Sequence, residues 1–62
     1  MRIDRNSTEI IKRLKKDGWV HKSTSGSHYQ FEKDGRKVTV PHPRKDLPIG
    51  TARSIARYVG WI

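Results

Sequence analysis

The chain has 62 residues, with 14 Lys and Arg against 6 Asp and Glu and a formal net charge of +8 at pH 7. A chain of this length removes only about 60% of its unfolded surface from water, which excludes a deep substrate cavity or an enclosed large cofactor. The absence of cysteine excludes a disulfide framework and a thiolate metal site, and three scattered histidines do not make a zinc motif. We therefore expect one domain over residues 1–62 without a metal or cofactor.

The hydrophobic content of 32% is low, but the apolar residues recur at regular spacings, as in a lean globular domain. No apolar run approaches the roughly 20 residues of a membrane span, and the N-terminus lacks the apolar core of a signal peptide. These features predict a soluble, cytoplasmic protein that does not contact membranes.

Positive charge is spread along the chain. Residues 1–22 carry seven basic and three acidic side chains, residues 23–43 carry three and two, and residues 44–62 carry four and one. A polyanion is the default partner of such a chain, and nucleic acid is the commonest intracellular polyanion. A well-solvated surface or an acidic protein partner would also account for the charge.

The first predicted element is a helix over residues 7–17. Asn6 can cap it, with Glu9 completing a capping box, and Gly18 can end it in a left-handed conformation. The apolar residues of this segment fall on one face and its lysines on the opposite face. They are Ile10, Ile11 and Leu14 against Lys12 and Lys16.

Three strands are predicted next, over residues 19–23, 28–33 and 36–40. Small polar residues make 23–27 a turn, and Asp34-Gly35 is a strong two-residue hairpin signal. That turn fixes the register of the last two strands, so that Tyr29 faces Val40 and Phe31 faces Val38 on an apolar face.

The polar face of the same hairpin pairs Gln30 with Thr39 and Glu32 with Lys37. His28 lies on this side opposite Pro41, which ends the strand because proline has no N–H for the ladder.

A proline-containing linker over residues 41–50 leads to a second helix over 51–59. Gly60 caps this helix, and Trp61 can fold back against the core. The order α-β-β-β-α predicts a two-layer α+β domain, in which both helices cover one face of a three-stranded antiparallel sheet.

Histidine is the best candidate for chemistry, because the six acidic residues are scattered and no glycine-rich nucleotide loop is present. His28 follows Gly26-Ser27 at a turn-to-strand junction, where backbone N–H groups, a hydroxyl and an imidazole could hold a phosphate. A solvent-facing filler role on an exposed strand is the competing interpretation. His21 has no local partner in the sequence, and the hairpin register places His42 near Ser27.

Basic and aromatic side chains also have two interpretations. Lys12, Lys16, Arg53 and Arg57 could follow a phosphate backbone or only solubilise the helices. Arg44 and Lys45 precede the second helix, whose terminal N–H groups attract anions. Trp19 and Trp61 could stack on bases, but each follows a helix-capping glycine, which favours core packing.

Five segments in this order resemble the HicA toxins of type II toxin–antitoxin pairs. They cover nearly the whole chain and are Leu14-Lys15-Lys16-Asp17-Gly18-Trp19, Gly26-Ser27-His28-Tyr29-Gln30-Phe31, Val38-Thr39-Val40-Pro41-His42-Pro43, Asp46-Leu47-Pro48 and Gly50-Thr51-Ala52-Arg53-Ser54-Ile55.

The resemblance implies a fold like that of double-stranded-RNA-binding domains and a ribonuclease that cuts mRNA to arrest translation and growth. It places the catalytic role on His28, without a metal, and implies a HicB-type antitoxin as partner, with DNA reached only through the toxin–antitoxin complex. For RNA binding we expect Lys22, Gly26, Ser27, His42, Arg44 and Lys45.

Two other functions remain open. A noncatalytic RNA-binding domain could use the same fold, with His28 only contacting RNA. A DNA-binding regulator is the third possibility, but no helix-turn-helix spacing is present.

Overall fold

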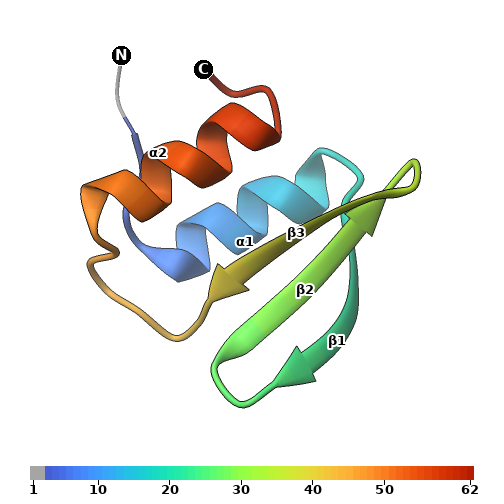
Figure 1. Cartoon of the computed structure of the whole chain (residues 1–62), viewed down its shortest axis with the longest axis horizontal. Coiled ribbons are helices and arrows are strands. Elements are labelled where there is room, and N and C mark those ends of the chain that lie inside the picture. The colour runs from blue at the N-terminus through green and yellow to red at the C-terminus, as the bar shows by residue number, and fades with distance from the viewer. Residues whose placement is uncertain (1–2) are drawn as a thin grey trace.

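The protein folds into two helices and a three-stranded antiparallel sheet. In the computed structural model, which describes residues 3–62, the elements are α1 (Ser7–Lys16), β1 (Val20–Ser25), β2 (His28–Lys33), β3 (Arg36–Pro41) and α2 (Ile49–Tyr58). The strand order is β1-β2-β3, and both helices lie on the same side of the sheet (Figure 1). The predicted α+β class and element order are confirmed. Residues 1 and 2 of the expected domain lie outside the described residues.

Asn6 caps α1 and Gly18 ends it, as predicted. The predicted return contact from Glu9 to Asn6 is not formed. Asn6 Oδ1 accepts hydrogen bonds from the backbone N–H groups of Thr8 and Glu9 at 2.9 and 3.3 Å. The Glu9 carboxylate lies 3.4 Å from Lys12 Nζ instead of returning to Asn6. Gly18 follows the helix with φ +97°, and the helix itself ends one residue earlier than predicted.

The β2–β3 hairpin has the register that Asp34-Gly35 predicts. Tyr29 pairs with Val40, Phe31 with Val38 and His28 with Pro41. Asp34 and Gly35 have φ values of +50° and +79°, as a two-residue turn with a matching strand twist requires. Pro41 is itself the last residue of β3, and pairing continues one step beyond it, because His42 N–H donates to Ser27 O at 2.7 Å.

The prediction for β1 was wrong at both ends. The strand begins at Val20, because Trp19 turns into the core, and it continues through Ser25. Strand pairing supports this extension: Thr24 pairs with Tyr29 and Ser25 with His28. The turn is therefore only Gly26-Ser27, and a register shift between His21 and Ser23 was not predicted.

The second helix begins two residues earlier than predicted and ends one residue earlier. Pro48 is the N-cap of α2: its ψ of 140° is still extended, and the helical residues begin at Ile49. The Pro48 carbonyl accepts the Ala52 N–H at 3.0 Å. Gly60 has φ +86°, and Trp61 N–H donates to Ala56 O at 2.7 Å, so the predicted glycine cap is confirmed.

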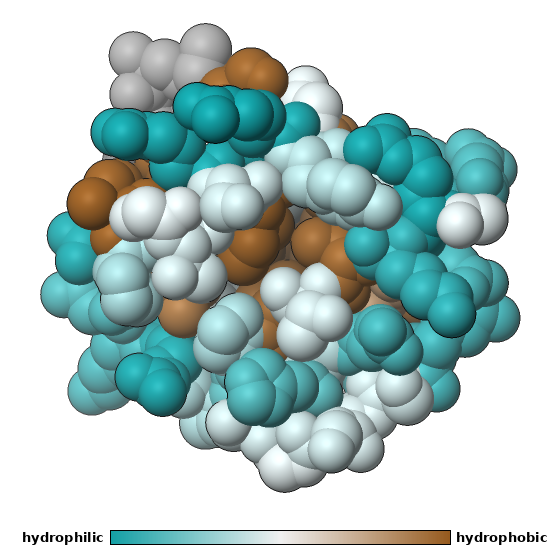
Figure 2. Space-filling view, viewed as in Figure 1, coloured by the Kyte–Doolittle hydropathy of each residue, from teal (hydrophilic) through white to brown (hydrophobic). Residues whose placement is uncertain are grey.

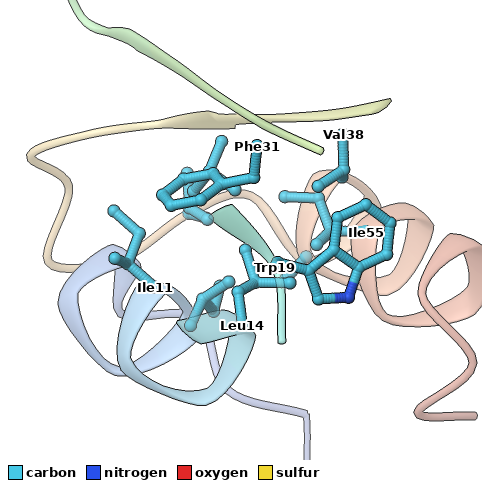
Figure 3. Close-up of a cluster of buried hydrophobic side chains, with 10 residues drawn as sticks. Ile11, Leu14, Trp19, Phe31, Val38 and Ile55 are labelled. Atoms are coloured by element: carbon cyan, nitrogen blue, oxygen red, sulfur yellow. The ribbon is translucent and has the colours of Figure 1, made fainter. Parts of the chain in front are cut away.

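One apolar core lies between the helices and the sheet (Figure 3). Leu14 of α1, Phe31 of β2 and Val40 of β3 are fully buried. Leu47, which the sequence places in a linker, is also buried, and Arg5 holds it in place: Leu47 N–H donates to Arg5 O and Arg5 Nε donates to Leu47 O, both at 2.7 Å.

The outer surface is mostly hydrophilic. Figure 2 shows hydrophobic atoms only in a central hollow and in small areas near the margin of this face, with hydrophilic residues around them. Within residues 3–62, no helix is both long enough and apolar enough to cross a membrane.

Candidate active site

The candidate site lies at the end of the sheet where β1 turns into β2. Gly26 has φ +58° and nothing within 4 Å of the place where a Cβ would sit, so its backbone is open to a ligand. Ser25 and Pro41 flank His28 on the two neighbouring strands. The sheet end therefore presents the predicted Gly26-Ser27-His28 corner to solvent.

His28 stands on the sheet face that the helices leave uncovered. Tyr29 and Phe31 point to the helices, and strand alternation puts His28 with Gln30 and Glu32 on the other face. The His28 side chain is exposed, and within residues 3–62 its ring has no hydrogen-bond or aromatic partner. Its imidazole nitrogens are thus free to meet a substrate.

His42 is held by its neighbours at the same end of the sheet. Its backbone N–H reaches Ser27 O, and its ring packs edge-on against Tyr29 with centroids 4.8 Å apart. Ring atom Nδ1 lies 2.7 Å from Ser7 Oγ. The ring does not contact His28, so a two-histidine pair is not formed, although both residues border Ser27.

His21 acquires partners that the sequence did not reveal. Its ring stacks on Tyr29 with centroids 5.1 Å apart, and Nε2 lies 2.7 Å from Thr24 Oγ1. The register shift in β1 brings this about, because it changes which residues of the strand face Tyr29. The following residue, Lys22, is four positions from Gly26, roughly 13 Å along a strand. It is therefore not gathered at the sheet end.

Arg44 and Lys45 border an open groove of about 480 Å³ between the start of α1 and the loop after β3. Asn6, Thr8 and Pro43 complete its lining. Arg44 also pairs with α1 through its backbone, since its carbonyl accepts the Ser7 N–H at 2.9 Å. Both basic side chains are exposed and positioned by this loop, which lies next to His42 in sequence.

The tryptophans and the helix-face lysines have different surroundings. Trp19 is buried in the core. Trp61 donates from Nε1 to Asp17 Oδ2 at 2.7 Å and lies under the Arg13 guanidinium at 4.3 Å. Both indoles therefore pack at helix exits, and Lys12 and Lys16 of α1 are exposed to solvent.

Ser7 is the residue near the site that sequence reasoning missed. It is the single buried polar residue within residues 3–62, and its hydroxyl contacts both His42 and the Arg44 N–H. A serine next to an asparagine cap looks like part of the cap, so no local signal distinguishes it. Only the approach of the 42–44 segment to the start of α1 gives it partners.

Comparison with known proteins identifies a family. A family model described as HicA toxin of bacterial toxin-antitoxin matches residues 7–61, which include all five elements of the fold. None of the curated proteins matches the chain. No group of three or more His, Cys, Asp or Glu side chains within residues 3–62 is arranged to hold a metal ion.

Proposed function

The chain belongs to the HicA toxin family of bacterial toxin–antitoxin systems, and on this premise we propose that it is an endoribonuclease that cleaves mRNA and so stops translation and growth. The proposal assigns the chemistry to His28 and the holding of the RNA strand to the loops around it. Family membership supports the toxin role directly. The residues at the end of the sheet support the reaction type.

The observation that carries this proposal is the exposed, unpartnered imidazole of His28 beside the Gly26-Ser27 turn. A polymer can reach an imidazole on a flat sheet face without a deep pocket. The adjoining turn has an open backbone at Gly26 and a hydroxyl at Ser27, which are suited to contact a phosphate. A small surface site of this kind suits a 62-residue chain.

The reaction that fits these groups is transesterification within the RNA. His28 takes the proton of a ribose 2′-OH, and the 2′ oxygen attacks the adjacent phosphorus while the bond from phosphorus to the 5′ oxygen breaks. The products are a 2′,3′-cyclic phosphate and a 5′-hydroxyl, which receives a proton from the imidazolium or from water. The reaction needs the 2′-OH, which makes RNA the substrate and leaves DNA intact.

Exposed basic side chains in the loop after β3 support the binding of RNA. Arg44 and Lys45 border the groove beside the start of α1, and cationic side chains stabilise the phosphate charge that builds up during the reaction. Lys22 would contact the RNA at a neighbouring nucleotide because it lies farther along β1. Gly26, Ser27 and His42 complete the set of RNA contacts that we propose.

For the partner, we propose a HicB-type antitoxin that covers the His28 face. The toxin carries a net charge of +8, and a complementary acidic surface would bind it with favourable electrostatics. A purified antitoxin of this type should abolish RNA cleavage at equimolar concentration. DNA binding would then be a property of the antitoxin in the complex.

A noncatalytic RNA-binding domain is the alternative function. It is favoured because no side chain within residues 3–62 orients the His28 ring, whereas catalytic histidines are commonly held by a second group. In this alternative His28 contacts RNA, and the antitoxin blocks binding instead of cleavage.

Both functions can be separated with one set of oligonucleotides. The protein is incubated with a single-stranded RNA, with the DNA of the same sequence, and with the RNA carrying a single 2′-deoxy nucleotide at the mapped cleavage position. We expect cleavage of the RNA with a cyclic phosphate end, and no cleavage at the deoxy position or in DNA. Retention of RNA without cleavage would support the noncatalytic alternative, and cleavage of DNA at the same rate would contradict the mechanism.

A further inference from the structure

The hydrogen bonds of Ser7 determine which ring nitrogen of neutral His42 carries the proton. Ser7 is fully buried, so water does not satisfy its hydroxyl. Its Oγ accepts the Arg44 N–H at 2.8 Å and lies 2.7 Å from His42 Nδ1. The hydroxyl hydrogen has no other acceptor within residues 3–62, and a buried unpaired donor is costly. The Ser7 O–H therefore donates to Nδ1, which makes Nδ1 an acceptor.

A neutral histidine whose Nδ1 accepts carries its proton on Nε2. No buried side-chain nitrogen or oxygen lacks a partner within residues 3–62, and Nε2 of His42 has no hydrogen-bond partner there. Nε2 is accordingly in contact with solvent. The ring offers an N–H donor in a fixed direction, because the Tyr29 ring packs against it with the two ring centroids 4.8 Å apart.

The surroundings of this N–H indicate what it binds. Ser27 O accepts the backbone N–H of His42, and Arg44 and Lys45, which follow His42 after Pro43, border a basic groove of about 480 Å³. In the described part of the chain, no acidic side chain lines that groove. An N–H donor that precedes two exposed cationic residues by two and three positions in the chain matches a phosphate oxygen of a nucleic-acid backbone.

We propose that Ser7 is a positioning residue that holds His42 in the Nε2–H form, so that His42 donates a hydrogen bond to a phosphate of the bound RNA beside Arg44 and Lys45. This inference rests on the proposed function only in naming RNA as the ligand. The alternative is that the Ser7–His42 contact only stabilises the packing of the loop after β3 against α1. In that case the free Nε2–H would have no role.

The ring nitrogens can be observed directly. Nitrogen-15 NMR of the uniformly labelled full chain, without RNA, should show His42 with an unprotonated Nδ1 and a protonated Nε2. A protonated Nδ1 in the neutral ring would overturn the positioning role of Ser7. Ser7→Ala should allow both tautomers to be populated, and persistence of a single Nε2–H form in a folded Ser7→Ala protein would also overturn it.

Two substitutions of His42 separate the two ring nitrogens. His42→Asn places an amide oxygen where Nδ1 lies and so keeps the contact with Ser7, but it lacks the distal donor. His42→Gln extends an amide N–H toward the position of Nε2 and loses the contact at Nδ1. Both are made in a His28→Ala background, so that RNA binding is measured without cleavage.

A hydrogen bond to a charged group predicts that His42→Asn weakens binding of single-stranded RNA by about tenfold or more. His42→Gln should bind more tightly than His42→Asn although it is less stable. Equal affinity of His42→Asn and its His28→Ala parent would overturn the phosphate contact. Failure of the proposed function would show elsewhere, as RNA left intact by the protein with His28 present.

Discussion

At the scale of single residues, the three histidines are distinguished by their partners. The His21 ring is bonded to Thr24 and the His42 ring to Ser7, whereas the exposed His28 ring has no partner within residues 3–62. In the sequence only the Gly26-Ser27-His28 corner singled out His28. The structure adds a physical difference: two imidazoles already use a ring nitrogen within the protein, and one has both available for a substrate.

Backbone conformation at single glycines gives a stability prediction. Gly60 has φ +86°, whereas Gly50 lies in the first turn of α2, and neither has any atom within 4 Å of a built Cβ. Gly60→Ala should therefore lower the free energy of unfolding by about 1–2 kcal/mol, because alanine is strained in the left-handed region. Gly50→Ala, the matched control, should leave it unchanged or raise it by up to about 1 kcal/mol. Urea titrations of both variants check this, and equal effects would contradict it.

At the scale of elements, the sequence predicts strand register best where a short turn fixes how the two strands beside it pair. Asp34-Gly35 determined the register of β2 and β3, and the glycine stops after both helices were found as expected. The start of α2 was misplaced because Gly50 resembles a helix breaker in sequence, while in the fold the helix begins at Ile49, directly after the N-cap Pro48. The end of β1 was misplaced because serine and threonine favour turns by composition, whereas here Thr24 and Ser25 pair with β2.

The candidate site could likewise be predicted only where its residues are close together in the sequence. The Gly26-Ser27-His28 corner is local and could be found in the sequence. The partners of His21 depend on an irregularity in β1, and those of His42 depend on a buried serine that is 35 residues away in the chain. The His42–Ser7 contact is long-range and has no signal in a single sequence, whereas the partners of His21 are close in the chain but are brought together by the irregularity in β1.

The cap of α1 can be tested at this scale. Asn6→Ala removes the acceptor for the N–H groups of Thr8 and Glu9 and should cost about 1 kcal/mol of stability. Thr8→Ala changes an exposed side chain on the first turn and should shift stability by less than about 0.5 kcal/mol. Thermal unfolding followed by circular dichroism compares the two. A loss of the same size in both variants would mean that the cap contributes nothing specific.

At the scale of the whole molecule, a two-layer fold leaves one sheet face open (Figure 1), and exposed basic side chains lie on both helices and in the loop after β3. The helices use one face of the sheet to form the core, so the other face is free for a partner. A net charge of +8 would bind a polyanion over a broad surface. RNA affinity should accordingly decrease steeply as salt concentration rises.

Two exposed lysines test whether this charge acts at specific places. Lys45 borders the groove near His42, and Lys37 lies on β3 toward the Asp34-Gly35 turn. Lys45→Ala should reduce the slope of log affinity against log salt by about 0.7 for single-stranded RNA, which corresponds to one lost phosphate contact. Lys37→Ala should leave the slope unchanged. The slopes are obtained by fluorescence anisotropy at a series of salt concentrations. Equal slopes in the two variants would indicate general electrostatic attraction instead of a specific phosphate contact at Lys45.

The central claim is that His28 performs the cleavage, and the rate of RNA cleavage by His28→Ala tests it most directly. His21→Ala serves as the matched control, since it also removes an exposed imidazole from the same sheet, and circular dichroism verifies that both variants are folded. Loss of a general base predicts that His28→Ala cleaves roughly a hundredfold to ten-thousandfold more slowly than the unsubstituted protein. His21→Ala should retain most of the activity. Cleavage by folded His28→Ala at the rate of the unsubstituted protein would contradict the account.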